Sequence, residues 1–190
     1  MWTLDEVENY VAEVKSRYGR LADKIDRVYL VGADPFVLSA EKLLTRISLI
    51  KKYLPNVAVI TMYARTDNIA HKSDEDLKRL KEAGVNELYI GVESGDDVVL
   101  KRINKGYTAA QACEVLEKID ASGLPYIVNF LNGAGGHGYG LENAHRTAQL
   151  YDGLHMTMVN TYMMTVVPGT SLYRARLSIS SCSFCFHEVP

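Results

Sequence analysis

The sequence alternates short apolar segments with amphipathic ones at a regular spacing, and this alternation restricts the fold more than any other feature. Candidate strands rich in β-branched residues begin near Arg27, Val57, Glu87, Tyr126 and Thr157. Their starts lie 30, 30, 39 and 31 residues apart, which is the length of one strand–helix unit. Because most of these segments are almost continuously hydrophobic, we expect strands that are buried on both faces of a parallel sheet.

The segments between the strands carry the signals of helix ends. Capping-box spacing occurs at Thr3 and Glu6 and again at Thr108 and Gln111, and glycine or proline follows most of the apolar stripes. Helices are therefore expected from Thr3 to Gly19, Ala40 to Pro55, Ser73 to Gly84, Thr108 to Gly123 and Leu141 to Tyr151. Five units in series fit either an open doubly wound sheet or a partial barrel, and they are too few for a full eight-stranded barrel.

Composition limits the class of protein but names no function. The chain has 190 residues, 47% of them apolar, and a net charge of −2, so we expect a globular core and no charge-driven binding to nucleic acid or membranes. Met1 opens no signal-like segment, which favours a cytoplasmic protein. We expect one core over residues 1–176 and an irregular tail over 177–190. The apolar stripe of the first helix needs a sheet to cover, so we expect that an upstream strand is missing.

Polar residues and glycines gather where each strand ends. In a parallel sheet these loops meet at one edge, where ligands bind. The loops are Gly32–Pro35, Tyr63–Asp67, Gly91–Asp97, Asn132–Gly138 and Pro168–Thr170. One such loop would indicate a simple turn, because turn glycines are common. Five on the same edge favour a ligand site.

Three smaller signals have competing interpretations. Gly133, Gly135 and Gly138 match G-x-G-x-x-G, which keeps a dinucleotide-binding open sheet as an alternative, although no acidic residue ends the next strand. Cys182, Cys185 and His187 have ligand-like spacing but lack a fourth ligand, so we expect no metal site. Cys113 is expected in the core. His137 alone among the histidines falls in a candidate site loop, and Asp96 and Asp97 are expected to cap a helix.

The segment Tyr89–Thr108 (YIGVESGDDVVLKRINKGYT) and the segment Val167–Tyr173 (VPGTSLY) resemble strand-end motifs of radical S-adenosylmethionine (SAM) enzymes. The similarity runs from about Arg27 to Tyr173. It is nearest to the branch of oxygen-independent coproporphyrinogen III oxidases, tRNA methylthiotransferases and Elongator-type catalytic subunits. The resemblance implies an α/β fold, a partial (β/α)6 TIM-like barrel of parallel strands whose first strand is missing. It also implies SAM and a 4Fe-4S cluster, with oxidoreductase chemistry through a 5′-deoxyadenosyl radical.

The resemblance assigns cofactor contacts residue by residue. Gly32–Pro35 stands where backbone carbonyls receive the SAM amino group. Glu93 matches an acid or amide that contacts SAM, Lys105 replaces an arginine near the SAM carboxylate, and Asn129 replaces an aspartate that bonds the ribose. The full set of expected cofactor-binding residues is Gly32, Ala33, Asp34, Pro35, Arg65, Glu93, Ser94, Lys105, Asn129, Gly133 and Pro168.

The sequence lacks the C-x-x-x-C-x-x-C motif whose thiolates hold the cluster in this family. We therefore expect that the cluster does not assemble on this chain and that the chain as given is inactive. No catalytic residue or substrate is assigned. The alternative from another class is a non-catalytic module that forms a homodimer through an exposed sheet edge.

Overall fold

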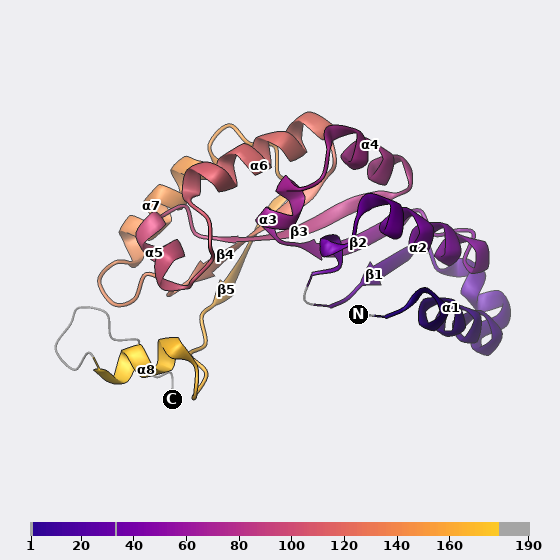
Figure 1. Cartoon of the computed structure of the whole chain (residues 1–190), viewed down its shortest axis with the longest axis horizontal. Helices are drawn as coiled ribbons and strands as arrows, with labels where there is room; N and C mark the ends of the chain where they lie inside the picture. The colour runs from indigo at the N-terminus through magenta and orange to yellow at the C-terminus, as the bar shows by residue number, and fades with distance from the viewer. Residues whose placement is uncertain (1, 33, 179–190) are drawn as a thin grey trace. The chain divides into compact units, whose positions relative to one another are not determined.

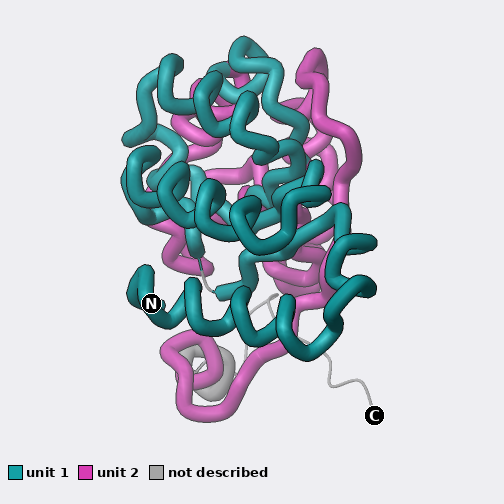
Figure 2. The backbone as a smooth tube through the Cα atoms, turned by 90° about the vertical axis from the view of Figure 1, so that its right-hand side faces the viewer, with its two compact units in different colours: residues 1–90, 118–126 teal, residues 91–117, 127–190 magenta. Residues whose placement is uncertain are grey.

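The computed structural model describes residues 2–32 and 34–178, and its elements are labelled in Figure 1. The chain forms two compact units (Figure 2). Unit 1 comprises Met1–Ile90 and Lys118–Tyr126, and unit 2 comprises Gly91–Glu117 and Ile127–Pro190. The strands follow the order β1-β2-β3-β4-β5, and the pairs β1–β2, β2–β3 and β4–β5 are parallel. The prediction of parallel strand–helix units is confirmed.

Unit 1 contains β1 (Arg27–Leu30), β2 (Val59–Ala64) and most of β3 (Val85–Glu93). In the β1–β2 ladder Arg27 pairs with Val59, and the β2–β3 register shifts between Ile60 and Thr61. The helices are α1 (Leu4–Tyr18), α2 (Ala40–Tyr53), α3 (Thr66–Ala70) and α4 (Asp74–Glu82), with two 3-10 segments, η1 (Gly19–Lys24) and η2 (Pro35–Val37).

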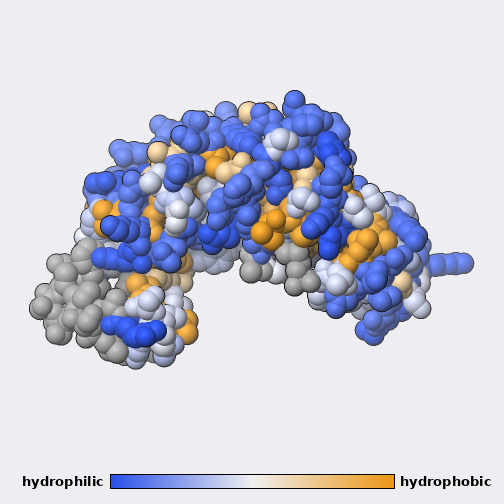
Figure 3. Space-filling view, viewed as in Figure 1, coloured by the Kyte–Doolittle hydropathy of each residue, from blue (hydrophilic) through white to orange (hydrophobic). Residues whose placement is uncertain are grey.

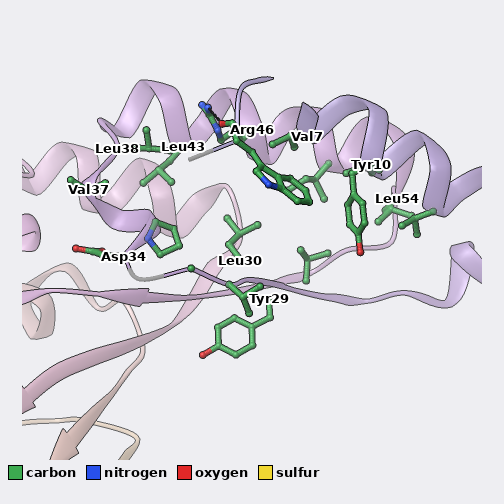
Figure 4. A pocket seen from close by; sticks show the side chains of 18 of the residues that line it. Val7, Tyr10, Tyr29, Leu30, Asp34, Val37, Leu38, Leu43, Arg46 and Leu54 are labelled. Atoms are coloured by element: carbon green, nitrogen blue, oxygen red, sulfur yellow. Dashed lines mark hydrogen bonds between the residues drawn. The ribbon is translucent and has the colours of Figure 1, made fainter. Parts of the chain in front are cut away.

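Alternate strand residues of unit 1 supply two different surfaces. One set forms the apolar core with α2 and α4, and its fully buried members include Leu43, Ile47, Ile60, Met62, Leu77, Leu80, Leu88 and Ile90. Burying each such side chain contributes about 1.5–3 kcal/mol relative to leaving it exposed. The other set carries Tyr29, Tyr63 and Tyr89, whose ring centroids lie 5.5 to 5.9 Å apart. Figure 4 shows Tyr29 on the side of β1 that faces away from the helices.

Unit 2 contains most of β4 (Tyr126–Asn132) and all of β5 (Met158–Met163), paired with Ile127 opposite Met158. Its helices are α5 (Asp97–Arg102), most of α6 (Ala109–Ser122), α7 (Gly140–Tyr151) and α8 (Ser171–Ser178). Helix α8 continues past the boundary that we expected at Arg176. The cysteine–histidine segment with Cys182, Cys185 and His187 lies outside the described residues.

Several expectations about helix ends are confirmed. Both capping boxes form, at Thr3–Glu6 and at Thr108–Gln111. Asp96 is the N-cap of α5, and its carboxylate accepts from the backbone N–H groups of Val98 and Val99. The short elements η1, η2, α3 and α5 were not predicted as separate elements, because they are too brief to show a helical repeat.

Two expectations about burial are wrong. Strands β1 and β5 are not buried on both faces, since most of their residues are at least partly exposed. They lie at the two ends of the strand order, where a strand has only one neighbour. Cys113 is half-buried rather than part of the core, and its thiol lies 3.8 Å from a carboxylate oxygen of Glu117. Among the described residues, no helix has the length and apolar character needed to cross a membrane.

Candidate functional site

The most unusual backbone in unit 2 lies at the carboxyl end of β3. Glu93 has a φ of 71°, the left-handed region that side chains other than glycine rarely adopt. Gly91, two residues earlier, leaves room for it, because a Cβ atom at position 91 would lie 2.8 Å from Glu93 Oε1. The strand end is therefore shaped around the carboxylate of Glu93. Strained backbone of this kind gathers at functional sites.

Glu93 faces a lysine across this strand end. Lys105 Nζ lies 3.6 Å from Glu93 Oε1, and both side chains are largely buried. Burial raises the pKa of Glu93, and the nearby Lys105 ammonium opposes this shift in part. Burial also raises the pKa of Tyr151, whose hydroxyl donates to the backbone carbonyl of Asn129 (3.4 Å). Glu93 and Lys105 thus form a largely buried pair of opposite charge, in which burial and the neighbouring charge shift the pKa of Glu93 in opposite directions.

Glu93 and Lys105 line a pocket of about 460 Å³. Its wall includes Glu93, Arg102, Lys105, Asn129 and Tyr162. Asn129 is 7% exposed, and its side-chain oxygen has no hydrogen-bond partner among the described residues. A buried acceptor without a partner costs about 1–3 kcal/mol. The pocket therefore presents an acceptor that a hydroxyl or N–H donor of a ligand can satisfy.

The residues after Glu93 pack against α7 instead of lining the pocket. Ser94 is fully buried, and its hydroxyl donates to Asn143 Oδ1 (2.6 Å). The buried carboxylate of Asp96 accepts from the Tyr139 hydroxyl (2.9 Å) and lies 3.1 Å from Arg146 Nε. These contacts fasten the loop to α7. Ser94, which we expected to bind cofactor, is thus occupied within the protein.

Two further predicted residues of unit 2 lie away from this pocket wall. Neither Gly133 nor Pro168 is among the residues that line it. Gly133 begins the loop before α7, with a φ of 86°. In the same loop the carbonyl of Gly135 accepts a hydrogen bond from Arg102 Nη1 (2.9 Å), so this glycine-rich loop is bonded to α5. Pro168 is exposed.

Unit 1 holds the remaining predicted residues. Asp34 caps η2 by accepting from Phe36 N (3.1 Å), and the Asn68 amide donates to its second oxygen. Lys72, which is 5% exposed, donates to the carbonyl of Phe36 (2.8 Å). Arg65 pairs with the carboxylate of Asp67 (3.0 Å). Gly32 has a φ of 151°, Pro35 is half-buried in η2, and Ala33 lies outside the described residues.

Unit 1 has a pocket of its own, with a larger volume of about 930 Å³. It lies between α1, α2 and β1, and Figure 4 shows side chains from the helices and from β1 pointing into it. Asp34, Arg65 and Asn68 add polar groups to a lining that is otherwise mainly apolar. Hydrophobic atoms reach the surface in this part of the molecule (Figure 3, right).

Sequence reasoning missed three residues that shape these sites, namely Tyr107, Tyr151 and Lys72. Tyr107 stands directly after the Lys105–Gly106 pair of the motif, so its position was available as a signal. Tyr151 and Lys72 are each at or near the end of a helix, where a tyrosine or lysine is ordinarily at the surface. Only the tertiary structure reveals that Lys72 is buried and that Tyr151 is half-buried.

A comparison with protein-family models matches residues 3–151 to the model described as "Radical SAM superfamily". The chain belongs to the radical SAM superfamily. This match covers the strand end at Glu93, Lys105 and Asn129, and it confirms the resemblance that the motifs indicated. It also favours the partial barrel over the open sheet.

Several named proteins and solved structures are similar to this chain. The chain is 29% identical over 148 residues to the heme chaperone HemW of Bacillus subtilis (strain 168), which covers 77% of this chain and 38% of that protein. The archaeal Elp3 of Methanocaldococcus infernus has a similar fold, with a TM-score of 0.67 at 14% identity over 94% of this chain and 46% of that one. Coproporphyrinogen III oxidase (HemN) from Escherichia coli gives 0.64 at 13% identity, over 97% and 43%. The chain spans less than half the length of the curated relatives that it matches.

The radical SAM family implies SAM and a 4Fe-4S cluster, and the chain fits the two differently. Residues 2–32 and 34–178 contain Cys113 as their one free cysteine and no group of three or more His, Cys, Asp or Glu residues placed to hold a metal. The sequence has three cysteines in all, none in the family's cluster motif. The residues therefore do not fit the cluster. The pocket of unit 2, with its unsatisfied Asn129 oxygen and the Glu93–Lys105 pair in its wall, does fit a ligand that carries hydrogen-bond donors and charges, such as SAM.

Proposed function

We propose that this chain is a SAM-binding core of the branch that contains HemW and HemN, and that the unit 2 pocket receives SAM. The observation that carries the proposal is the buried, unpaired oxygen of Asn129 in the same pocket wall as Glu93 and Lys105. SAM offers ribose hydroxyls, an ammonium and a carboxylate. The Asn129 oxygen can accept from a ribose hydroxyl, and the Glu93–Lys105 pair can bind the ammonium and the carboxylate of SAM.

Each side chain has a distinct part in this proposal. The Lys105 ammonium attracts the carboxylate of the methionine portion, because opposite charges interact strongly in a partly buried site. Glu93 accepts from a hydroxyl or from the ammonium. Asn129 accepts from a ribose hydroxyl and thereby loses its desolvation cost. In unit 1, Gly32–Pro35 and Arg65 remain predicted contacts from the family resemblance.

We further propose that the chain as given makes no 5′-deoxyadenosyl radical. In the family the cluster anchors SAM and supplies the electron that cleaves it. The sequence has no cysteine motif for that cluster. Anaerobic reconstitution with iron and sulfide should give no stoichiometric 4Fe-4S spectrum and no 5′-deoxyadenosine. Either product would contradict this part of the proposal.

The SAM site is tested by replacing the amide that carries the unpaired acceptor. Asn129→Leu keeps the branched shape and the number of heavy atoms of the side chain, and it should weaken SAM binding about 3- to 10-fold, which corresponds to one hydrogen bond. Equilibrium dialysis with labelled SAM measures the affinity. Because Leu removes a buried oxygen that has no partner, the ligand-free variant should unfold at a urea concentration no lower than the wild type does.

Asn56→Leu is the matched control, since Asn56 is exposed in unit 1 and its side-chain amide donates to the backbone carbonyl of Asp23, away from the pocket. It should leave SAM affinity unchanged. If SAM does not bind the wild-type chain, or if Asn129→Leu binds it as well as wild type does, the proposed site is wrong.

A second candidate, self-association, is favoured by the free edge of β1. In the described part of the chain β1 pairs only with β2, and Val31 at its end is 75% exposed. No lysine or proline protects the segment Val28–Val31 from edge-to-edge pairing. We propose a homodimer through this edge. Sedimentation should show a dimer that Val31→Lys weakens, whereas a monomer at all concentrations would reject this candidate.

A further inference from the structure

Tyr107 lies beside the strained strand end but has no part in the proposed contacts with SAM. Its hydroxyl is 2.9 Å from the backbone carbonyl oxygen of Gly91 and 3.2 Å from that of Val92. These two carbonyls immediately precede Glu93. One phenolic hydroxyl therefore holds the two peptide units that lead into the left-handed residue.

The backbone of Glu93 needs such support. A non-glycine residue at φ 71° is strained and persists only where its surroundings fix it. Lys105 Nζ lies 5.7 Å from the Tyr107 ring centroid, so the same tyrosine also contacts the partner of Glu93. Tyr107 thus contacts both the backbone that leads into Glu93 and the ammonium group of Lys105.

The geometry points to Tyr107 as a positioning residue: its hydroxyl fixes the Gly91 and Val92 carbonyls, and this holds the Glu93 carboxylate beside Lys105 in the pocket of unit 2. The role of Tyr107 at the strand end follows from contacts within this chain. Its consequence for ligand binding rests on the proposed function, because it concerns the same site.

The first test needs no ligand. Tyr107→Phe removes one oxygen atom and keeps the ring, and the titration of Glu93 is followed by carboxyl carbon NMR. The ionisable groups around Glu93 are Lys105, Tyr107 and Tyr151, with Arg102 on the same pocket wall. Release of the strand end should let the carboxylate reach water, so the pKa of Glu93 should fall toward the ordinary value of about 4.3.

Tyr18→Phe, which alters an exposed tyrosine of unit 1, is the control and should leave the titration unchanged. Circular dichroism establishes that each variant is folded. A Glu93 titration in Tyr107→Phe that coincides with the wild-type curve would overturn the inference.

The second test uses SAM and a double-mutant cycle. Tyr107→Phe should weaken SAM binding about 3- to 10-fold, as expected for the loss of one positioned contact. In a Glu93→Gln background the same change should have no further effect, because Tyr107 acts through Glu93. Equal losses in both backgrounds would contradict the inference. A wild-type chain that does not bind SAM would reject the proposed function, and the titration would still decide the role of Tyr107.

Discussion

Gly91 and Gly95 lie four residues apart in the same strand-end segment, and the structure predicts opposite consequences for the same substitution. A Cβ atom at Gly95 would lie 2.7 Å from the backbone oxygen of Arg146 and 2.7 Å from the Cα of Thr147. Both atoms belong to α7, whose backbone cannot move aside without disturbing the packing of the helix. At Gly91 the close atom is the end of the flexible Glu93 side chain, at 2.8 Å.

The magnitudes follow from these contacts. Gly95→Ala should lower the free energy of unfolding by about 1–3 kcal/mol, the usual cost of overpacking. Gly91→Ala should cost little stability, because Gly91 has an ordinary φ that alanine adopts readily and alanine restricts the unfolded chain. Its Cβ must nevertheless displace the Glu93 carboxylate from its place beside Lys105. We therefore expect weaker SAM binding from Gly91→Ala with the fold retained.

Urea unfolding and equilibrium dialysis with SAM separate the two variants. With an unfolding slope of about 2 kcal/mol per molar urea, Gly95→Ala should shift the midpoint down by roughly 0.5–1.5 M. Gly91→Ala should stay near the wild-type midpoint. Equal destabilisation of the two variants, or full SAM affinity in folded Gly91→Ala, would refute the argument that Gly91 makes room for Glu93.

Three other predictions concern the same loop and the first helix. Burial raises the pKa of Glu93 above its value in the unfolded chain. The contribution of Glu93 to stability is therefore present at low pH and is lost as the pH rises through the folded pKa. Relative to wild type, Glu93→Gln should gain stability between pH 4 and pH 7, which urea unfolding at each pH measures. Asp96→Ala removes a buried carboxylate that caps α5 and bonds Tyr139, while its charged partner Arg146 is half-exposed. It should therefore cost about 1–3 kcal/mol, and a loss below about 0.5 kcal/mol would contradict its structural role. Thr3→Ala breaks the capping box of α1 and should cost about 1 kcal/mol by the same assay, with the exposed Thr45→Ala as the comparison.

Periodicity predicted the larger elements because each presents a repeated pattern over many residues. The stripe from Val7 to Tyr18 lies in α1, as its spacing indicated, and the run from Val57 to Met62 overlaps β2, which begins two residues later at Val59. The same reasoning could not show that β1 and β5 are half-exposed, since exposure depends on neighbours that the local sequence does not name. It also placed Cys113 in the core, although a cysteine beside Glu117 on the edge of an apolar stripe turns partly outward.

The candidate site was only partly visible in the sequence, for a physical reason that Glu93, Ser94 and Asp96 illustrate. All three are polar residues in one continuous motif, and a motif does not state which side chains face a ligand. The left-handed backbone at Glu93 keeps its carboxylate in the pocket. The next residue, Ser94, bonds Asn143, and Asp96 bonds Tyr139. The Glu93 side chain faces the pocket and the next side chain, Ser94, faces α7. This change of direction depends on the backbone angles at Glu93, which the motif does not state.

The two glycines of this segment leave space for two different neighbours. Gly91 has no side chain because the Glu93 carboxylate occupies that space, and Gly95 has none because α7 occupies the space beside it. The missing side chain at Gly91 leaves room for a carboxylate of the pocket, and the missing side chain at Gly95 lets the segment pack against α7. A chain without cluster cysteines retains both. Its fold and its small-molecule pocket can therefore be measured separately from radical chemistry, which makes SAM binding the experiment that distinguishes a retained cofactor site from a retained scaffold.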